Sequence, residues 1–174
     1  MYEIFGEMDS VEELNATAEG LKKEGDRENL YRLAGENGID SAFVDMYLGG
    51  AENLCCDAAT AALGKIEAEA AGLKPVEIMA DWVEYIKTLC GDEGDDSFAR
   101  AVRRRGKSLK GCIGCLLEWS FQKRYRVGSD IIKAAGLGGM QVEMGIPGMG
   151  TAKKLIREYY LGKGAVENEE GRTH

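Results

Sequence analysis

The residues best suited to chemistry in this chain are its five cysteines, Cys55, Cys56, Cys90, Cys112 and Cys115. Two of them form a C-x-x-C sequence, Cys112-Ile113-Gly114-Cys115, a spacing used by zinc sites and redox centres. Here it lies within an apolar helical pattern, no second C-x-x-C exists, and the only histidine is His174. Because free cysteine also packs as a small apolar residue, we expect free thiols and no bound metal, with a zinc site as the minor alternative.

Nucleophilic and acid–base catalysis find little support in the sequence. A Ser–His–Asp or Cys–His arrangement needs a histidine in the body of the fold, and His174 is the last residue. The 30 acidic residues guarantee chance pairs of carboxylates, so no single pair indicates a site. We therefore expect a protein that is not an enzyme and uses no cofactor.

The glycine-rich stretch 145–151 can be compared with two phosphate-binding motifs. The phosphate-binding loop of nucleotide hydrolases requires G-x-x-x-x-G-K-[ST], and Thr151 stands where that motif requires lysine. Residues 147–150 before a helix also resemble the hairpin of helix-hairpin-helix DNA-binding proteins, which presents backbone amides to a phosphate. In that family a small residue usually lies four positions past the second glycine, where this chain has Lys154. The sequence favours a simple turn between a strand and a helix.

Charge is divided unevenly along the chain. The net charge of −8 combines 23 acidic and 7 basic residues in 1–98, a net −16, with 15 basic and 7 acidic residues in 99–174, a net +8. The basic half suits nucleic acid or an acidic protein, and the acidic half suits a basic, nucleic-acid-binding protein. The alternative is that both halves are solvated helix faces, or attract each other within a monomer or dimer.

This division supplies the candidate binding residues. The cations expected to contact nucleic acid or a partner are Arg103, Arg104, Arg105, Lys107, Lys110, Lys123, Arg124, Arg126, Lys153 and Lys154. The acidic face expected to contact a partner consists of Glu12, Glu13, Glu19, Asp26, Glu28 and Asp45. Trp119, Phe121 and Tyr125 are interleaved with some of the cations, as stacking surfaces can be. However, Trp119 and Phe121 also fall on an apolar helical arc, which favours the core for both.

Helices must position most of these residues. Residues 107–127 form the longest strongly apolar segment, with apolar residues three, four, seven and eight positions apart, which predicts a helix over 108–127. Its apolar arc is so wide that we expect a central helix, covered on most sides. Residues 140–146 alternate between apolar and other residues, which predicts a strand. Its expected partner is residues 2–5 or the same strand of a second copy.

The sequence as a whole predicts a mainly α fold, a single compact domain of about eight or nine helices with a minor β element at residues 2–5 and 140–146. An acidic helical half (1–91) precedes a basic helical half (95–162) packed on the central helix, and residues 163–174 form a disordered tail. The isolated strand and the apolar stretch 140–149 favour a homodimer. No apolar run reaches about 18 residues and the N-terminus lacks signal-peptide features, so we expect a cytoplasmic protein without a membrane span.

Four stretches together resemble a known group of proteins: 2–7 (YEIFGE), 106–112 (GKSLKGC), 145–147 (GIP) and 157–162 (REYYLG). They are similar to small proteins of phages and mobile elements in gut Firmicutes, whose members resemble anti-CRISPR inhibitors of the type II effector Cas9. The half from Lys107 onward is also similar to the PcfK-like proteins of conjugative elements. The resemblance covers most of residues 2–162.

The resemblance implies inhibition of an RNA-guided nuclease by binding. Cas9 holds its heteroduplex in a positively charged channel and must pass a conformational checkpoint before it cuts. The implied partner is the Cas9–guide RNA complex, with the acidic face on protein and the basic half on RNA or DNA backbone. The alternative function is a DNA-binding accessory protein of a phage or conjugative element, which uses residues 100–126 and the turn near Gly148. That alternative predicts binding to naked duplex with a steep loss on adding salt.

Overall fold

The computed structural model describes residues 4–92 and 94–163 of the chain. Within these ranges it contains nine helices and one two-stranded antiparallel sheet, so the predicted mainly α fold with a minor β element is confirmed. The elements in chain order are α1 (Val11–Glu24), α2 (Arg27–Glu36), α3 (Ser41–Leu48), α4 (Ala58–Leu73), α5 (Ile78–Cys90), α6 (Ser97–Arg103), α7 (Leu109–Gln122), β1 (Tyr125–Arg126), α8 (Ser129–Ala134), β2 (Glu143–Met144) and α9 (Met149–Leu161).

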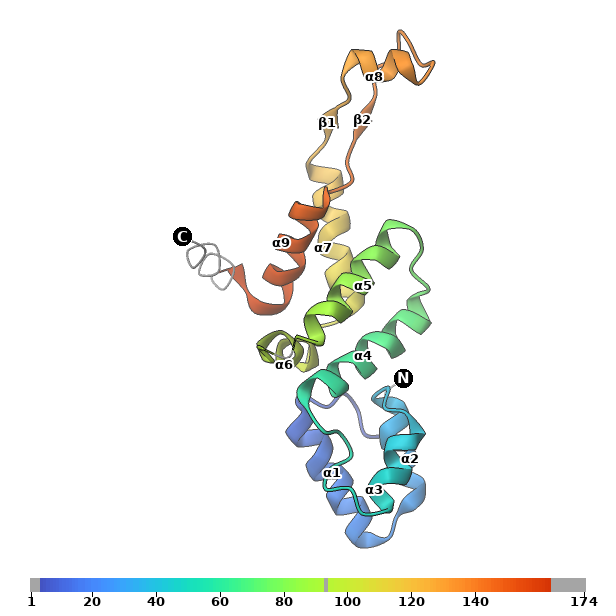
Figure 1. Ribbon diagram of the computed structural model, residues 1–174, viewed down its shortest axis with the longest axis vertical. Coiled ribbons are helices and arrows are strands. Elements are labelled where there is room, and N and C mark those ends of the chain that lie inside the picture. The colour runs from blue at the N-terminus through green and yellow to red at the C-terminus, as the bar shows by residue number, and fades with distance from the viewer. Residues whose placement is uncertain (1–3, 93, 164–174) are drawn as a thin grey trace.

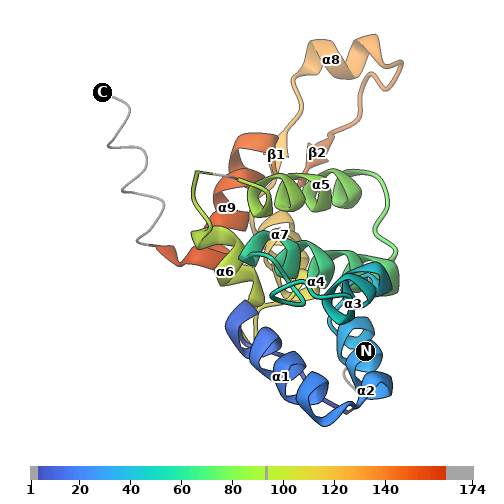
Figure 2. The same ribbon diagram turned by 60° about the horizontal axis from the view of Figure 1, so that its bottom comes forward.

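Figure 1 shows an elongated molecule. Helices α1, α2 and α3 lie at one end and α4 to α6 form the middle, with α7 and α9 side by side next to α5. From α7 the chain runs into β1, α8 and β2, which project from the body at the opposite end, and the turned view in Figure 2 shows the same projection. One hydrophobic core includes buried residues from both the acidic and the basic half, as expected for a single domain.

Side-chain caps set the starts of several helices. The capping residues of α1, α2, α3, α4 and α7 are Ser10, Asp26, Asp40, Asp57 and Ser108. Each of these side chains accepts a hydrogen bond from a backbone N–H two or three residues further on, at 2.7 to 3.1 Å. Such a cap contributes about 1 kcal/mol, because it satisfies a donor that the first helical turn leaves unpaired.

Helices α4 and α6 form the centre of the fold, where they meet through small side chains. Ala61 and Ala62 of α4 and Ala99 and Ala101 of α6 are all buried. Alanine side chains let two helix backbones approach closely, so α4 and α6 pack directly against each other in the core. The central position predicted for residues 108–127 is therefore wrong.

Helix α7 is shorter and more exposed than its apolar pattern predicted. It ends at Gln122, and its buried residues are Leu109, Cys112 and Leu116, all in its first two turns or so. Leu117 is 54% exposed and Phe121 is 68% exposed. Helical periodicity identifies a helix and its apolar side. Which residues on that side are buried depends on the neighbouring elements, so the pattern was wrong about burial.

A close backbone contact joins the acidic helices to α4. Gly38 follows α2 in a left-handed conformation, with φ 72°, and faces Gly64 within α4. A Cβ placed on Gly64 would lie 2.6 Å from the carbonyl oxygen of Gly38, and one placed on Gly38 would overlap the carbonyl oxygen of Gly64. Glycine at both positions therefore lets the two backbones touch, although glycine weakens a helix interior by itself.

The predicted strand near 140–146 has a different partner from either that was expected. Only Glu143 and Met144 belong to it, and they pair with Arg126 and Tyr125 of β1, respectively. Ile4 forms no strand, and residues 2 and 3 lie outside the described part. The chain turns back through α8, which brings β2 beside β1 and supplies the pairing within one chain. The unpaired strand thus no longer argues for a homodimer, which stays a prediction.

Two further expectations concern the ends of the chain and the membrane. Of the tail predicted at 163–174, all but Lys163 lies outside the described residues. In the part that the structure describes, no helix has the length and apolar character needed to cross a membrane.

Candidate functional site

Arg103 is the clearest correction to the predicted binding residues. Its side chain is buried within the fold, with 1% exposure. One guanidinium nitrogen donates to Asn37 Oδ1 at 2.7 Å and to the Met8 carbonyl at 3.2 Å, and the other donates to the Ala61 carbonyl at 3.4 Å. These acceptors come from three separate segments, so Arg103 holds the N-terminal helices against α4 and α6 and does not face a partner.

Lys107 also has a structural role. Its ammonium donates to the Tyr159 carbonyl at 2.5 Å and lies 4.7 Å from the centre of the Tyr159 ring. Its own carbonyl accepts a bond at 2.7 Å from Lys65, a buried lysine of α4 whose ammonium also donates to Glu7 at 2.5 Å. Lys107 therefore joins α4 to α9, a structural role in place of the predicted contact with a partner.

Two arginines near α6 connect the basic half to the acidic helices. Arg100 contacts Glu12 at 2.7 Å, and this hydrogen bond holds the pKa of the Glu12 carboxyl below its ordinary value. Arg105 contacts Glu13 at 3.2 Å, and its backbone N–H donates to Asp9 at 2.6 Å. Exposed ion pairs of this kind contribute little stability, about 0–1 kcal/mol each. They do show that the two halves attract each other along this seam.

The predicted acidic residues all have partners inside the chain. Besides Glu12 and Glu13, Glu19 pairs with Lys23 and Glu28 pairs with Arg32, each at 2.5 Å, while Asp45 accepts from the Tyr31 hydroxyl and Asp26 caps α2. These pairs do not neutralise the region. Residues 4–57 contain 13 acidic and only 4 basic residues, so the end formed by α1 to α3 stays strongly negative. We call it the acidic end.

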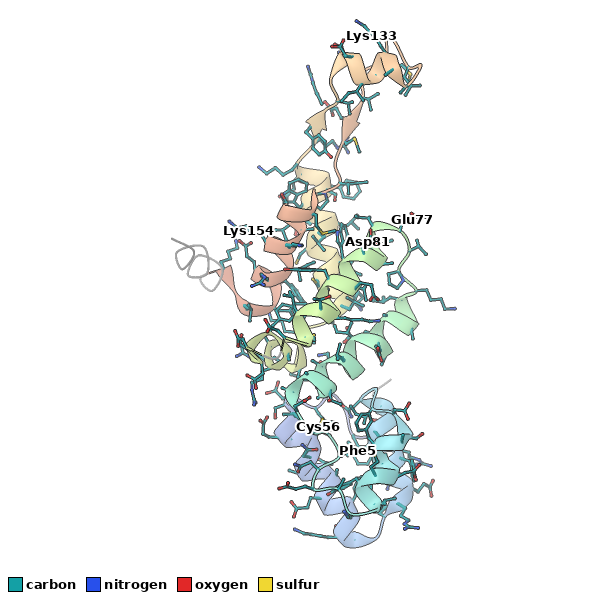
Figure 3. The ribbon with its side chains drawn as sticks, in the orientation of Figure 1. Phe5, Cys56, Glu77, Asp81, Lys133 and Lys154 are labelled. Atoms are coloured by element: carbon teal, nitrogen blue, oxygen red, sulfur yellow. The ribbon has the colours of Figure 1, made fainter. Side chains whose placement is uncertain are left out.

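The remaining predicted cations lie in three places. Arg104 and Lys110 are exposed on the body, and Lys110 lines a hollow of about 350 Å³ beside α4. Lys153 and Lys154 are exposed on α9, with the ammonium of Lys153 5.0 Å from the centre of the Tyr85 ring. Figure 3 places Lys154 on the outer side of α9. These four side chains do not form one surface with the others.

The last group of cations lies on the projection formed by residues 123–148, which we call the arm. Nearly all of its side chains are exposed, with Ile132 and Pro147 the buried exceptions among these residues. It carries Lys123, Arg124, Arg126 and Lys133, and Figure 3 places Lys133 at its far end. Arg126 lies 3.7 Å from Glu143 and Lys133 lies 3.8 Å from Asp130, both long and solvent-exposed contacts. In the described part of the chain, Lys123 and Arg124 have no ion-pair partner.

Apolar side chains gather where the arm leaves the body. Leu117 and Phe121 of α7 line a hollow of about 260 Å³ together with Arg124, Glu143 and Ile146. Tyr125 stands opposite Met144 across the two strands, and both are exposed. The sequence pattern placed Leu117 and Phe121 on the covered side of a central helix, which is wrong. The sequence signal for exposure was the apolar stretch 140–149, which was expected to contact a second copy and which includes Met144 and Ile146.

The cysteines are separated by the fold. Cys55, Cys90 and Cys112 are buried, while Cys56 and Cys115 are exposed. Among the described residues, no three His, Cys, Asp or Glu side chains are placed so that they could hold a metal ion. Burial raises the pKa of Cys55, Cys90 and Cys112 to about 12, because the thiolate form loses its hydration.

This separation predicts selective thiol chemistry. In the native protein at neutral pH, iodoacetamide should modify Cys56 and Cys115 much faster than the other three, since the thiolate is the reactive form. Peptide mass spectrometry after a short exposure would measure the modified fraction at each cysteine. The unfolded protein, as control, should be modified at all five. Rapid native modification of Cys112 would contradict the packing of α7 described here.

Comparison with known proteins adds no assignment: no protein-family model, no curated protein and no solved structure matches this chain.

Proposed function

We propose that the protein is a non-catalytic inhibitor that binds a Cas9–guide RNA complex. The observation that carries the proposal is the separation of charge in space. The acidic end and the cationic arm lie at opposite ends of an elongated molecule (Figure 1). A ribonucleoprotein offers a matching surface to each, because a protein channel that holds nucleic acid is positive and the RNA is negative.

The ion pairs at the seam leave this separation in place. Arg100 and Arg105 pair with Glu12 and Glu13 in the middle of the molecule, whereas no described ion pair joins the arm to the acidic end. The acidic end therefore stays strongly negative, while the arm, with four basic and two acidic residues, has a net charge of +2. Two weak contacts made at once by one protein combine into a much stronger one, because the second contact forms at a high effective concentration.

The resemblance to anti-CRISPR proteins supports this partner among ribonucleoproteins. An inhibitor seated on the positive channel would block target DNA or hold the nuclease before its checkpoint. The proposal places the protein in the cytoplasm of a bacterial host, where such a complex assembles.

A cleavage assay tests the proposal. Type II Cas9 nucleases from gut Firmicutes are assembled with guide RNA, mixed with increasing amounts of the protein, and given linear duplex target. We expect cleavage to fall to background when the protein is in excess. Full cleavage at a large excess for every nuclease tested would remove the proposal.

A restriction endonuclease acting on the same duplex serves as the control. A Cas9 inhibitor leaves this second enzyme active. A DNA-binding accessory protein, the alternative function, would shield the duplex from both enzymes at low salt and lose this effect as salt is added.

A further inference from the structure

We propose that the base of the arm binds single-stranded nucleic acid by stacking bases on Phe121 and Tyr125. The inference rests on the proposed function for its biological ligand, because single-stranded RNA segments of the guide complex are what such a surface would meet. Its physical basis is the local arrangement of rings and cations.

The two rings are exposed and close in the chain. Phe121 lies in the last turn of α7 and is 68% exposed, and Tyr125 is the first residue of β1 and is 47% exposed. The Tyr125 hydroxyl donates to the Ile146 carbonyl at 3.4 Å, which limits how far its ring can swing. Stacking a nucleobase on an exposed aromatic ring contributes about 1–3 kcal/mol per base and tolerates any sequence.

Cations alternate with the rings. Lys123 and Arg124 lie between Phe121 and Tyr125 in the chain, and Arg126 follows directly. Lys123 and Arg124 have no ion-pair partner in the described part, so their charge is available to phosphates. A ligand that matches this surface must be both anionic and flat-faced. A nucleotide strand supplies both, the charge from its phosphates and the flat faces from its bases.

A close backbone contact positions the apolar side chains around Phe121. Gly145 passes so close to the end of α7 that a Cβ there would overlap the carbonyl oxygen of Ser120. This contact holds Ile146 beside Leu117 and Phe121, and the three side chains line the hollow with Arg124 and with Glu143, whose carboxylate lies 3.7 Å from Arg126. The faces of bases in a duplex are already stacked on each other and cannot reach such a surface. The site therefore favours a single strand over a duplex.

Fluorescence anisotropy of a labelled oligouridylate, with the full chain and no nuclease present, tests the inference. We expect saturable binding that is tighter than binding to duplex RNA and that weakens as salt is added. Phe121→Ala and Tyr125→Ala should each weaken binding about 5- to 100-fold, and Lys123→Gln with Arg124→Gln should reduce the salt dependence. The matched control is Tyr31→Ala, which removes an exposed ring at the acidic end and should leave binding unchanged.

Equal affinity for single strand and duplex, or unchanged binding by Phe121→Ala, would overturn the inference. So would a dimer in light scattering that Phe121→Ala dissociates, since a second copy would then occupy this surface. Circular dichroism of each variant confirms that it is folded. Oligouridylate binding without nuclease inhibition would remove the Cas9 partner and keep the site, while inhibition without oligouridylate binding would do the reverse.

Discussion

Replacing Arg103 by methionine is expected to lower the free energy of unfolding by about 1–3 kcal/mol, because buried acceptors then lose their donor. Arg103 donates to Asn37 Oδ1, the Met8 carbonyl and the Ala61 carbonyl, all inside the protein. Methionine keeps much of the apolar stem but donates no hydrogen bond. Urea unfolding followed by circular dichroism at fixed pH measures the change.

The neighbouring residue provides the control. Arg104 is exposed at the end of α6, so Arg104→Met should change the free energy of unfolding by no more than about 0.5 kcal/mol. The two variants have the same composition and differ only in where the arginine stood. If both unfold at the same urea concentration, Arg103 does not have the structural role assigned to it.

Gly64→Ala should lower the free energy of unfolding by about 1–3 kcal/mol, even though alanine is the better helix former. The added methyl group would lie 2.6 Å from the carbonyl oxygen of Gly38, which belongs to backbone and cannot rotate away. The acidic helices must then move relative to α4. Thermal unfolding monitored by circular dichroism shows whether the substitution stabilises or destabilises the protein.

Gly72→Ala tests the same substitution in the same helix without the contact. No atom lies within 4 Å of a Cβ placed there, so only helix propensity acts, and stability should rise by about 0.5–1 kcal/mol. The free energy of unfolding should therefore fall for Gly64→Ala and rise for Gly72→Ala. A stabilising Gly64→Ala would show that α2 and α4 do not meet as described.

Local sequence signals predicted the helices and strands better than they predicted how these elements pack against one another. The mainly α fold could be predicted from the periodicity, because that periodicity depends only on neighbouring residues. The exposure of Phe121 and the pairing of β2 with β1 depend on where the chain turns back through α8. Periodicity within a segment carries no information about that turn. For the same reason the pattern overestimated how central residues 108–127 are.

The sequence could predict that the candidate site is rich in lysine and arginine, but not which of these residues are exposed. Residues 103, 104 and 105 are three consecutive arginines, and nothing in their identity separates the buried one from its neighbours. The rotation of α6 about its own axis, which its packing on α4 sets, decides which of the three arginines is buried. By contrast, Lys123, Arg124 and Arg126 follow the end of α7, and they remain exposed because the arm leaves the body there.

The central claim is that the acidic end and the arm together recognise protein and RNA in one complex. Biolayer interferometry can compare the affinity of the protein for an assembled Cas9–guide RNA complex with its affinity for Cas9 alone and for guide RNA alone. The account predicts that the assembled complex binds at least about tenfold more tightly than either component, because both contacts then form at once. Affinity for the complex that is no higher than that for its better component would contradict the account.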